Sequence, residues 1–450
     1  MATALVRGAV SGLAPALQES PFKFLRAMRA DTLGTLERWA RLGPVARIQA
    51  GSRVTLLVTA PQAVQRVLQD NPRNYRKDIR FTRITRPALG DALFSSDGDR
   101  WRAQRRVAQP AFHRQQIASM TSAMVDAIEA MLGRWQTFAN SGDRFDLQTE
   151  TSRLTIDVIG RTLVGQDLLP YAAKIAAAMA STFDYLNHAF NHLFTAPLFV
   201  PTARNRSFKR AVHEIHELAR IIVDRRKNTR SGTETDLLAM LMQAFGSEPD
   251  SADLRDNLLT FLGAGTETTA VALCWAWYLL GRHPDAYQKL KDEVDSVIGS
   301  KRPTFEDVPK LTCTRMVVDE AMRLYPPAWV ISRTAIDADT LCGFSVPAGA
   351  SVLTSPWVTH RSGLYWENPE RFDPERFRAE RTRDRPEYAY YPFGGGPRMC
   401  IGDRFSVSEQ ILALAMTAQR FRVNVEHDGV PEPVFSLRPR SGMRASLEAV

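Results

Sequence analysis

A glycine-rich loop that ends in one cysteine and runs directly into an apolar helix most limits how this chain of 450 residues can fold. The glycines at 394–396 permit backbone conformations and close contacts that a Cβ atom would prevent. The run 406–421 is largely apolar and predicts a helix after Cys400. Backbone N–H groups at the start of this helix and the positive end of its dipole favour a charged sulfur, so we expect a lowered pKa for Cys400.

The residues around this cysteine follow a longer pattern. A lone cysteine beside a turn is more often a buried structural residue, but this segment resembles the haem-ligand signature of the cytochrome P450 family, Phe-x-x-Gly-x-Arg/His-x-Cys-x-Gly. The fixed positions are met by Phe393, Gly396, Arg398, Cys400 and Gly402. The resemblance is to soluble, bacterial-type members, and it implies that Cys400 ligates the iron of haem b (iron protoporphyrin IX). Arg398 would pair with an acidic group at the ring edge, and Gly402 would leave room for the flat macrocycle.

A polar stretch at 264–269 interrupts the most apolar predicted helix. Threonine hydroxyls can bond back to helix carbonyls and glycine weakens the helix, so a local widening able to hold water or dioxygen is predicted. A solvent-facing polar stripe is the alternative. The stretch resembles the family's Ala/Gly-Gly-x-Asp/Glu-Thr-Thr/Ser oxygen-activation motif. That resemblance implies that Thr268 steadies dioxygen and, with Glu267, supports proton delivery to the distal oxygen.

Glu320 and Arg323 lie three residues apart on a predicted helix and therefore share a face. With the later Pro-Glu-Arg-Phe segment, they resemble the family's buried charged triad, which implies that Arg376 is the third member. The triad would hold the loop that leads to Cys400, and loss of one member would unfold the protein or release its haem. The dipeptide Arg-Phe also occurs five residues earlier, so Arg371 is the alternative to Arg376.

Trp101 and Arg105 resemble the family's Trp-x-x-x-Arg pattern, in which both side chains reach the haem propionates. An indole N–H and a guanidinium are donors without an acceptor, which suits a carboxylate partner. An amphipathic helix with one buried tryptophan is the simpler alternative. By its position in the family pattern, Arg333 is the implied third propionate partner.

The charge balance indicates which kinds of partner the chain can bind. The chain has 58 Lys and Arg against 49 Asp and Glu, a net charge of +9, without a run of like charges. This favours a solvated basic surface and no nucleic-acid partner. The chain shows no flavin or nicotinamide fingerprint, so electrons are expected from a ferredoxin or flavodoxin with its reductase. The arginines at 102, 106, 114 and 404 are the expected basic docking face.

Cysteine usage and the N-terminus indicate a cytoplasmic protein without a membrane anchor. The four cysteines form no Cys-x-x-Cys pair, which argues against a zinc site or a disulfide framework. Residues 1–20 look like neither a signal peptide nor an anchor and are expected to be flexible. The longest apolar run, 270–280, is too short to span a bilayer. Residues 1–450 are expected to form a single large domain.

We predict a mainly α fold with a small β region, which the resemblance identifies as the cytochrome P450 fold. A hairpin is predicted at 45–48 and 54–58, a helix at 61–68, and irregular structure at 356–399. Further helices are predicted at 101–135, 149–165, 170–190, 205–227, 235–245, 251–281, 284–298 and 314–325.

The resemblance implies hydroxylation or epoxidation of a hydrophobic small molecule with one atom of dioxygen. The candidate pocket walls, by family position, are mostly apolar: 79–93, 183–199, 260–264, 328–331 and 435–437. A terpenoid, a fatty acid and a polyketide all fit such walls. Two other functions stay open: a peroxide-driven haem-thiolate enzyme, against which Glu267 and Thr268 argue, and a non-catalytic haem sensor.

Overall fold

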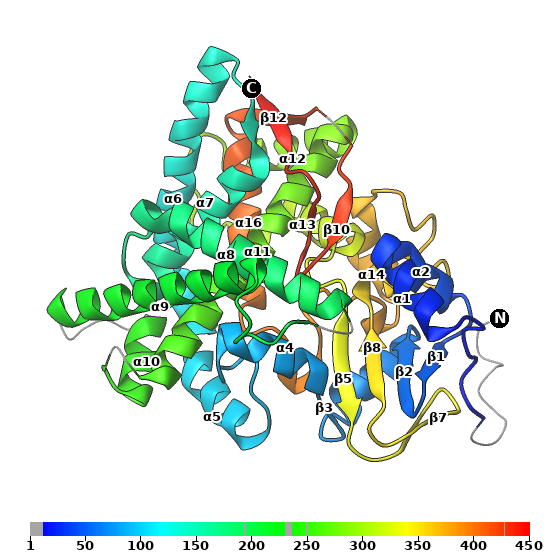
Figure 1. Cartoon of the computed structure of the whole chain (residues 1–450). Coiled ribbons are helices and arrows are strands. Elements are labelled where there is room, and N and C mark those ends of the chain that lie inside the picture. Colours follow the sequence, from blue (N-terminus) through cyan, green and yellow to red (C-terminus); the bar gives the residue numbers. More distant parts are fainter. Residues whose placement is uncertain (1–11, 193–194, 230–235, 249–250, 427) are drawn as a thin grey trace. The chain divides into compact units, whose positions relative to one another are not determined.

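The structure, a computed structural model, describes residues 12–192, 195–229, 236–248, 251–426 and 428–450. The chain divides into two compact units, each built from segments that are separated in the sequence. Figure 1 colours their elements along the chain. The first unit contains Met1–Ile84, Ala328–Arg371 and Glu380–Cys400, and the second contains Thr85–Pro327, Phe372–Ala379 and Ile401–Val450.

The first unit holds a five-stranded sheet in the order β1-β2-β8-β5-β3. Strands β2 and β8 are parallel, and the other neighbours are antiparallel. The strands are β1 (Val45–Ala50), β2 (Arg53–Val58), β3 (Tyr75–Lys77), β5 (Ile331–Ala335) and β8 (Ser351–Thr354). The predicted hairpin is confirmed, because β1 pairs with β2 around Gly51, whose φ of 60° suits glycine.

Side chains along β2 point alternately to the two faces of the sheet, and one of these faces forms part of the core of this unit. Leu56 and Val58 pack in one buried cluster with Val45 and Val64, while Leu57 between them points to the opposite side of the strand. The other elements of the first unit are α1 (Pro21–Ala30), α2 (Thr32–Ala40), α3 (Pro61–Gln65), α14 (Pro356–Thr359), β6 (Asp339–Leu341) and β7 (Phe344–Val346). Helix α2 packs against β1 and β2.

Part of the N-terminal segment that was expected to be flexible has ordered contacts. Gly12 forms a bridge with Phe344, Ala16 forms one with Arg47, and Ala14 is buried. Residues 12–17 are therefore packed against the first unit, contrary to the prediction, and residues 1–11 lie outside the described part of the chain.

The second unit is mainly helical and is organised around α11 (Ala252–Arg282). Helix α11 packs against α7, α9, α10, α12, α13, α16 and β9 (Figure 1). The other helices are α5 (Gly98–Ala108), α6 (Arg114–Ser141), α7 (Leu147–Ile159), α8 (Ala172–Asn191), α9 (Ala203–Thr229), α10 (Leu237–Phe245), α12 (Pro284–Val297), α13 (Thr312–Leu324) and α16 (Asp403–Ala418). Its strands are β4 (Phe145–Asp146), β9 (Phe421–Val425), β10 (Pro431–Pro433), β11 (Leu437–Pro439) and β12 (Arg444–Ala449). Two short helices, α4 (Ile79–Leu89) and α15 (Ala379–Thr382), continue from one unit into the other.

Helix α11 is a core helix. Among the described residues it is the one helix whose length and apolar composition would let it cross a membrane, and 72% of its most apolar window is buried inside the protein. Trp275 shows how it is held, because its indole N–H donates to the Leu437 carbonyl at 2.7 Å and its ring stacks on Tyr325.

Most predicted helices are confirmed, and four boundaries are wrong. The helix predicted at 149–165 is α-helical only to Ile159 and continues as a π-helical turn at Gly160–Val164. The helix predicted at 101–135 is broken by a short 3-10 helix at Gln109–Phe112, because Pro110 cannot continue the α-helical hydrogen bonds. The helix predicted at 61–68 ends at Gln65 and continues as one π-helical turn. The helix predicted at 406–421 begins at Asp403 and ends at Ala418, since Phe421 starts β9.

Candidate functional site

The cysteine loop in the first unit is a tight turn that closes on itself. The Cys400 N–H donates to the Phe393 carbonyl at 3.0 Å, and the Met399 N–H donates to the Gly396 carbonyl at 3.0 Å. Gly396 has a φ of 63°, and a Cβ there would lie 1.9 Å from the Leu68 carbonyl oxygen. Any other residue at 396 would push the loop away from the segment at 66–70. The loop leaves Cys400 as the one exposed cysteine of the four.

The loop also neighbours strand β5 within the first unit. A Cβ on Gly394 would lie 3.5 Å from the side chain of Ile331, which begins β5. Arg333 lies two residues along this strand and is partly buried, as is Arg398 in the loop. The first unit therefore carries the predicted ligand and two predicted propionate partners on neighbouring elements.

Helix α5 carries the other predicted propionate partners in the second unit. Asp97 caps the helix by accepting the Gly98 N–H at 2.8 Å. Trp101 and Arg105 lie one turn apart and are partly buried, whereas Arg102 and Arg106 are exposed on another face. This burial pattern separates the two predicted roles of the helix, haem binding and partner docking.

Gly402 precedes α16 at its N-terminal cap. A Cβ there would lie 3.6 Å from the ring of Phe112, which is an ordinary van der Waals distance. Packing within the protein therefore does not by itself require glycine at 402.

The polar stretch of α11 keeps its α-helical form. The Thr268 hydroxyl donates to the Ala264 carbonyl at 2.7 Å, which is the predicted back-bond. The helix is α-helical throughout, so the predicted widening does not take the form of another helix type. Gly265 has a packing role that we did not predict, because a Cβ there would lie 2.6 Å from Cδ1 of Ile159 on α7.

Glu267 is a partly buried acid on the same stretch. Burial raises the pKa of its carboxyl, and this rise is partly offset by the Ser436 hydroxyl and the positive charge of Arg438. The Ser436 hydroxyl donates to Oε1 of Glu267 at 2.8 Å.

The charged cluster predicted around Glu320 is assembled inside the second unit. Arg323 donates from Nε and Nη2 to the two oxygens of Glu320, at 2.6 and 2.8 Å, and both side chains are fully buried. Nε of Arg376 lies 3.4 Å from Oε1 of Glu320, while Arg371 is exposed. The Asp373 N–H donates to the same oxygen at 2.9 Å. These contacts support Arg376 over Arg371 as the third member.

A side chain from α12 caps the N-terminus of α13, the helix that carries Glu320 and Arg323. The carboxylate of Glu293 on α12 accepts the N–H groups of Cys313 and Thr314 at 2.6 and 2.8 Å. These are backbone donors that a helix N-terminus otherwise leaves unsatisfied. The cap therefore helps to set where α13 begins.

Helix α16 carries a buried acid that none of the sequence motifs includes. Glu409 is fully buried, and neither carboxylate oxygen has a hydrogen-bond partner among the described residues. Burial raises the pKa of Glu409 well above its ordinary value. A signal was visible in the sequence, because Glu409 and Gln410 directly precede the apolar run 411–416 on the same predicted helix.

A short polar chain links α11 to α16. The Gln410 amide donates to the Ser406 hydroxyl at 3.1 Å, and that hydroxyl is 3.0 Å from the Thr269 hydroxyl. Thr269 follows Thr268 directly, so the chain fixes the backbone beside the predicted oxygen-site threonine. Residues 137 positions apart form this link, and no local pattern predicts it.

Two of the predicted pocket walls meet in the second unit. The ring of Phe435 stacks on Phe183 of α8 with centroids 4.9 Å apart, and lies 5.8 Å from the ring of Phe94. Residues 193–194, within the wall predicted at 183–199, lie outside the described residues. The contacts form an apolar aromatic cluster near the start of β11.

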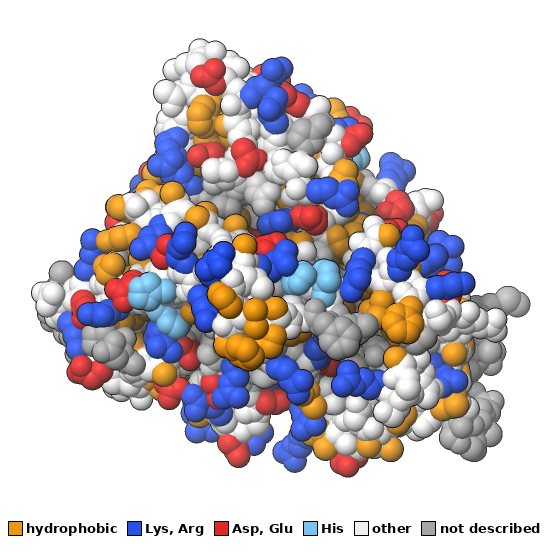
Figure 2. Space-filling model, in the orientation of Figure 1, with side chains coloured by type: hydrophobic (Ala, Val, Ile, Leu, Met, Phe, Trp, Pro, Cys, Tyr) orange, Lys and Arg blue, Asp and Glu red, His pale blue; other side chains and the backbone are white. Residues whose placement is uncertain are grey.

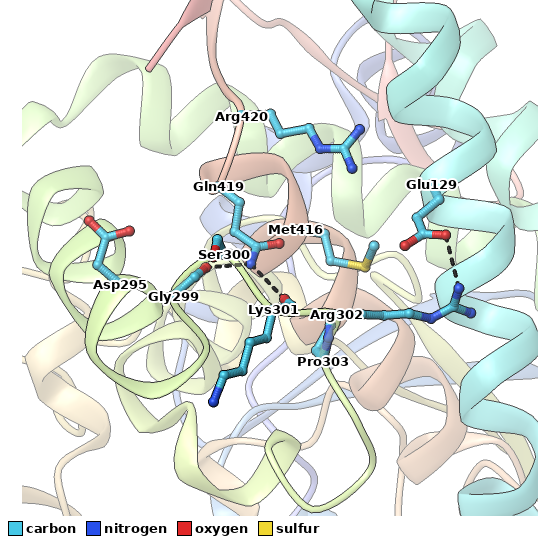
Figure 3. A pocket seen from close by; sticks show the side chains of 10 residues that line it. All are labelled: Glu129, Asp295, Gly299, Ser300, Lys301, Arg302, Pro303, Met416, Gln419 and Arg420. Atoms are coloured by element: carbon cyan, nitrogen blue, oxygen red, sulfur yellow. Dashed lines mark hydrogen bonds and ion pairs between the residues drawn. The ribbon is translucent and has the colours of Figure 1, made fainter.

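A separate open hollow of about 380 Å³ lies at the ends of α12 and α16 (Figure 3). Its charged lining is partly paired, since Arg302 donates to Glu129 at 3.0 Å and also contacts Asp126. The Gln419 amide donates to the carbonyls of Gly299 and Lys301. The hollow contains none of the predicted site residues.

Comparison with known proteins identifies the family. The family model described as Cytochrome P450 matches residues 36–446. Cyclooctatin synthase of Streptomyces melanosporofaciens is 35% identical over 439 residues, which cover 96% of this chain and 91% of the relative. Cyclooctat-9-en-7-ol 5-monooxygenase of the same organism is 34% identical over 424 residues, covering 91% and 86%. Pentalenene oxygenase of Streptomyces avermitilis is 32% identical over 401 residues, covering 87% of each chain.

These matches extend over most or nearly all of the chain, and two of the three relatives are named as oxygenases. They agree with the resemblance found in the motifs and with the mainly helical fold. The chain therefore belongs to the cytochrome P450 family of haem-thiolate monooxygenases.

Proposed function

We propose that this monooxygenase uses Cys400 as the thiolate ligand of its haem and oxidises a terpenoid substrate. The observation that carries the ligand assignment is the exposed Cys400 at the end of a loop that Gly396 holds against Leu68. A sulfur presented on a rigid loop suits a metal ligand, because the ligand must be preorganised.

The residues fit a haem group. Cys400 is exposed, as a sulfur that must reach a bound group requires, while the other three cysteines are buried or partly buried. Four side chains supply only N–H donors, as two propionates require: Trp101, Arg105, Arg333 and Arg398. Haem with a thiolate ligand supplies dioxygen binding and O–O bond cleavage.

The residues of α11 would manage protons and water. The Thr268 hydroxyl is already ordered by its bond to Ala264 and can accept a bond on its free lone pair. Burial raises the pKa of Glu267, which favours its protonated form and suits a group that holds a proton for transfer. We assign Thr268 to the ordering of dioxygen and Glu267 to proton delivery.

A carbon monoxide difference spectrum tests the ligand. We expect the reduced wild-type protein to give the red-shifted Soret band of a thiolate-ligated haem, and Cys400→Ala to lose it. Cys313→Ala, which removes a partly buried thiol on α13, is the matched control and should keep the band. An unchanged band in Cys400→Ala would disprove the assignment.

The terpenoid proposal rests on the names of three relatives and on the aromatic cluster. Relatives named for cyclooctatin, cyclooctat-9-en-7-ol and pentalenene match most of the chain. The apolar rings of Phe94, Phe183 and Phe435 suit a hydrocarbon substrate. Spectral titration with pentalenene, a fatty acid and a macrolide tests this, and tighter binding of the fatty acid or the macrolide would contradict the proposal.

An acidic ferredoxin or flavodoxin is the proposed electron donor. Arg102 and Arg106 are exposed on α5, Arg114 begins α6, and Arg404 lies in the first turn of α16. Phe112, between α5 and α6, packs edge to face on Phe405 with centroids 6.3 Å apart. This contact brings the ends of the three helices together, which supports one shared basic face.

We also propose that the chain works in the cytoplasm, without a membrane anchor, as a single domain over residues 1–450. One observation bears on the membrane alone: the apolar surface of α11 is committed to the core of the second unit, which argues against this helix as a membrane span.

A further inference from the structure

Glu267 receives a hydrogen bond from a residue that no site motif includes. The donor is the hydroxyl of Ser436, 2.8 Å from Oε1. Ser436 is 1% exposed and lies directly before β11 in the β10–β11 hairpin. The two residues are 169 positions apart, so the contact exists only because the hairpin folds onto α11.

Leu437, the residue after Ser436, is held through both its backbone N–H and its backbone carbonyl. The Leu437 N–H donates to the Pro327 carbonyl at 3.0 Å. The Leu437 carbonyl accepts the indole N–H of Trp275 at 2.7 Å, and Trp275 is part of α11. The hairpin is therefore anchored to the same helix that carries Glu267.

The residue before Ser436 is fixed by ring packing. Phe435 stacks on Phe183 with an interplanar angle of 12°, and a second ring, Phe94, lies 5.8 Å away. Both neighbours of Ser436 are thus restrained, and the hydroxyl is held in position before any reaction begins.

Among the described residues around Glu267, Ser436 is the one that donates a hydrogen bond to its carboxylate. Arg438, on β11, is the charged group that acts on Glu267 among the described residues, and its Nε donates to Glu432 at 3.0 Å. Since Arg438 is engaged by Glu432, it does not take over the role of the serine hydroxyl.

We propose that Ser436 is a positioning residue for Glu267, whose hydroxyl holds the carboxyl in one orientation on α11 for proton delivery. This inference rests on the proposed role of Glu267. Loss of the hydroxyl would leave the acid in place but free to rotate, with one stabilising donor fewer for its charged form.

An infrared pH titration of the protonated Glu267 carboxyl band tests the proposal without turnover. The band is assigned by its loss in Glu267→Gln. We expect Ser436→Ala to move the pH midpoint of this band upward, because the hydroxyl lowers the pKa of the carboxyl. Ser436→Thr keeps a hydroxyl and should restore the wild-type midpoint.

Turnover gives a second readout, with pentalenene as the probe and a ferredoxin system as the electron source. We expect Ser436→Ala to lower kcat at least about fivefold with little change in KM, part of the hundredfold or more that a general acid contributes. Peroxide release per NADPH should rise. Ser408→Ala, which removes a buried serine from α16, is the control and should match the wild type.

The outcomes separate this inference from the function on which it rests. An unmoved band in Ser436→Ala, or equal effects of Ser436→Ala and Ser408→Ala, would overturn the role of Ser436. A Glu267→Gln variant with wild-type kcat would instead overturn the role of Glu267.

Discussion

One carboxylate, that of Glu320, meets two guanidinium groups inside the second unit. The Glu320 and Arg323 side chains are fully buried, and Arg376 is nearly so. Removing charges from water costs several kcal/mol each, and only close pairing offsets that cost. The cluster therefore determines whether the chain through 373–376 can pack against α13.

Arg323→Ala should strongly destabilise the protein. The substitution removes both hydrogen bonds from Arg323 and leaves Glu320 buried with Arg376 and the Asp373 N–H. We therefore expect a loss of about 3–5 kcal/mol in the free energy of unfolding. Chemical denaturation and haem content measure the effect. The control is Arg371→Ala, an exposed arginine of the same region, which should change stability by less than about 0.5 kcal/mol. Equal midpoints for the two variants would contradict the buried cluster.

Glu409 presents the opposite case, an acid that is buried without a hydrogen-bond partner in the part of the chain that the structure describes. Its raised pKa means that the folded state holds a proton that the unfolded chain releases at lower pH. Stability from this group is therefore present below the unfolded pKa and is lost as the pH rises toward the folded pKa.

Glu409→Gln should become more stable than the wild type as the pH rises. Within the window between the two pKa values, the difference should grow by about 1.4 kcal/mol per pH unit, the value of one protonation equilibrium. Denaturation curves from pH 5 upward measure it. Glu380→Gln, an exposed acid on α15, controls for the lost surface charge. A stability difference between Glu409→Gln and the wild type that does not change with pH would contradict a raised pKa for the buried Glu409 carboxyl.

At the scale of elements, α11 and α7 pack closely because Gly265 has no side chain. The nearest atom to a Cβ there is Cδ1 of Ile159, at 2.6 Å. Glycine in a helix interior lowers helix stability by roughly 0.5–1 kcal/mol relative to alanine. The chain retains it where a closer helix contact offsets that cost.

Gly265→Ala should destabilise the protein by about 1–3 kcal/mol through overpacking. Ile159→Val removes the clashing atom, so the double variant should lose less stability than the sum of the two single variants. Thermal or chemical denaturation of all three measures the coupling. Gly133→Ala on α6, where an added Cβ meets no described atom within 4 Å beyond its own stretch of helix, is the control and should stabilise the protein slightly. Additive effects of the 265 and 159 changes would exclude the contact.

The long helices of the second unit were predictable as elements, whereas most strands and the helices α1, α2 and α4 were not predicted. Helices α8, α9, α11 and α12 carry their apolar pattern over several turns, so the sequence defines them within a few residues. Strands such as β3 and β11 have three residues each. No repeat can be recognised over that length, because these strands exist through pairing with distant partners.

At the scale of the whole molecule, the net charge of +9 is spread out rather than concentrated. Lys and Arg side chains are scattered among acidic and apolar ones over the face drawn in Figure 2. Local placement of arginines, rather than total charge, would then decide where an acidic partner binds.

Reversing Arg102 and Arg106 to Glu should slow reduction by an acidic ferredoxin at least about tenfold at low salt. The effect should shrink as salt is added, because exposed charges are screened. Stopped-flow reduction measures it. The double reversal of Lys209 and Arg210 on α9 changes the net charge equally and should have little effect. Equal slowing in both variants would assign the effect to net charge alone.

Local spacing along the chain was enough to predict the groups that carry the chemistry of this protein. Three features follow from the spacing of residues that are close in sequence: the cysteine after the glycine loop, Cys400, the bond from the Thr268 hydroxyl to Ala264, and the pair Glu320 and Arg323. Such contacts follow from the geometry of a helix or a turn, which is the same wherever the element lies.

Which distant side chains join these groups depends on how the chain folds. It selected Arg376 rather than Arg371 as a partner of Glu320, brought Ser436 to Glu267, and placed Ile159 against Gly265. These contacts depend on how whole elements pack, and a side chain far along the chain leaves no trace in the local pattern of its partner. The fold therefore supplied the partners, because burial and register are properties of the packed unit rather than of any one segment.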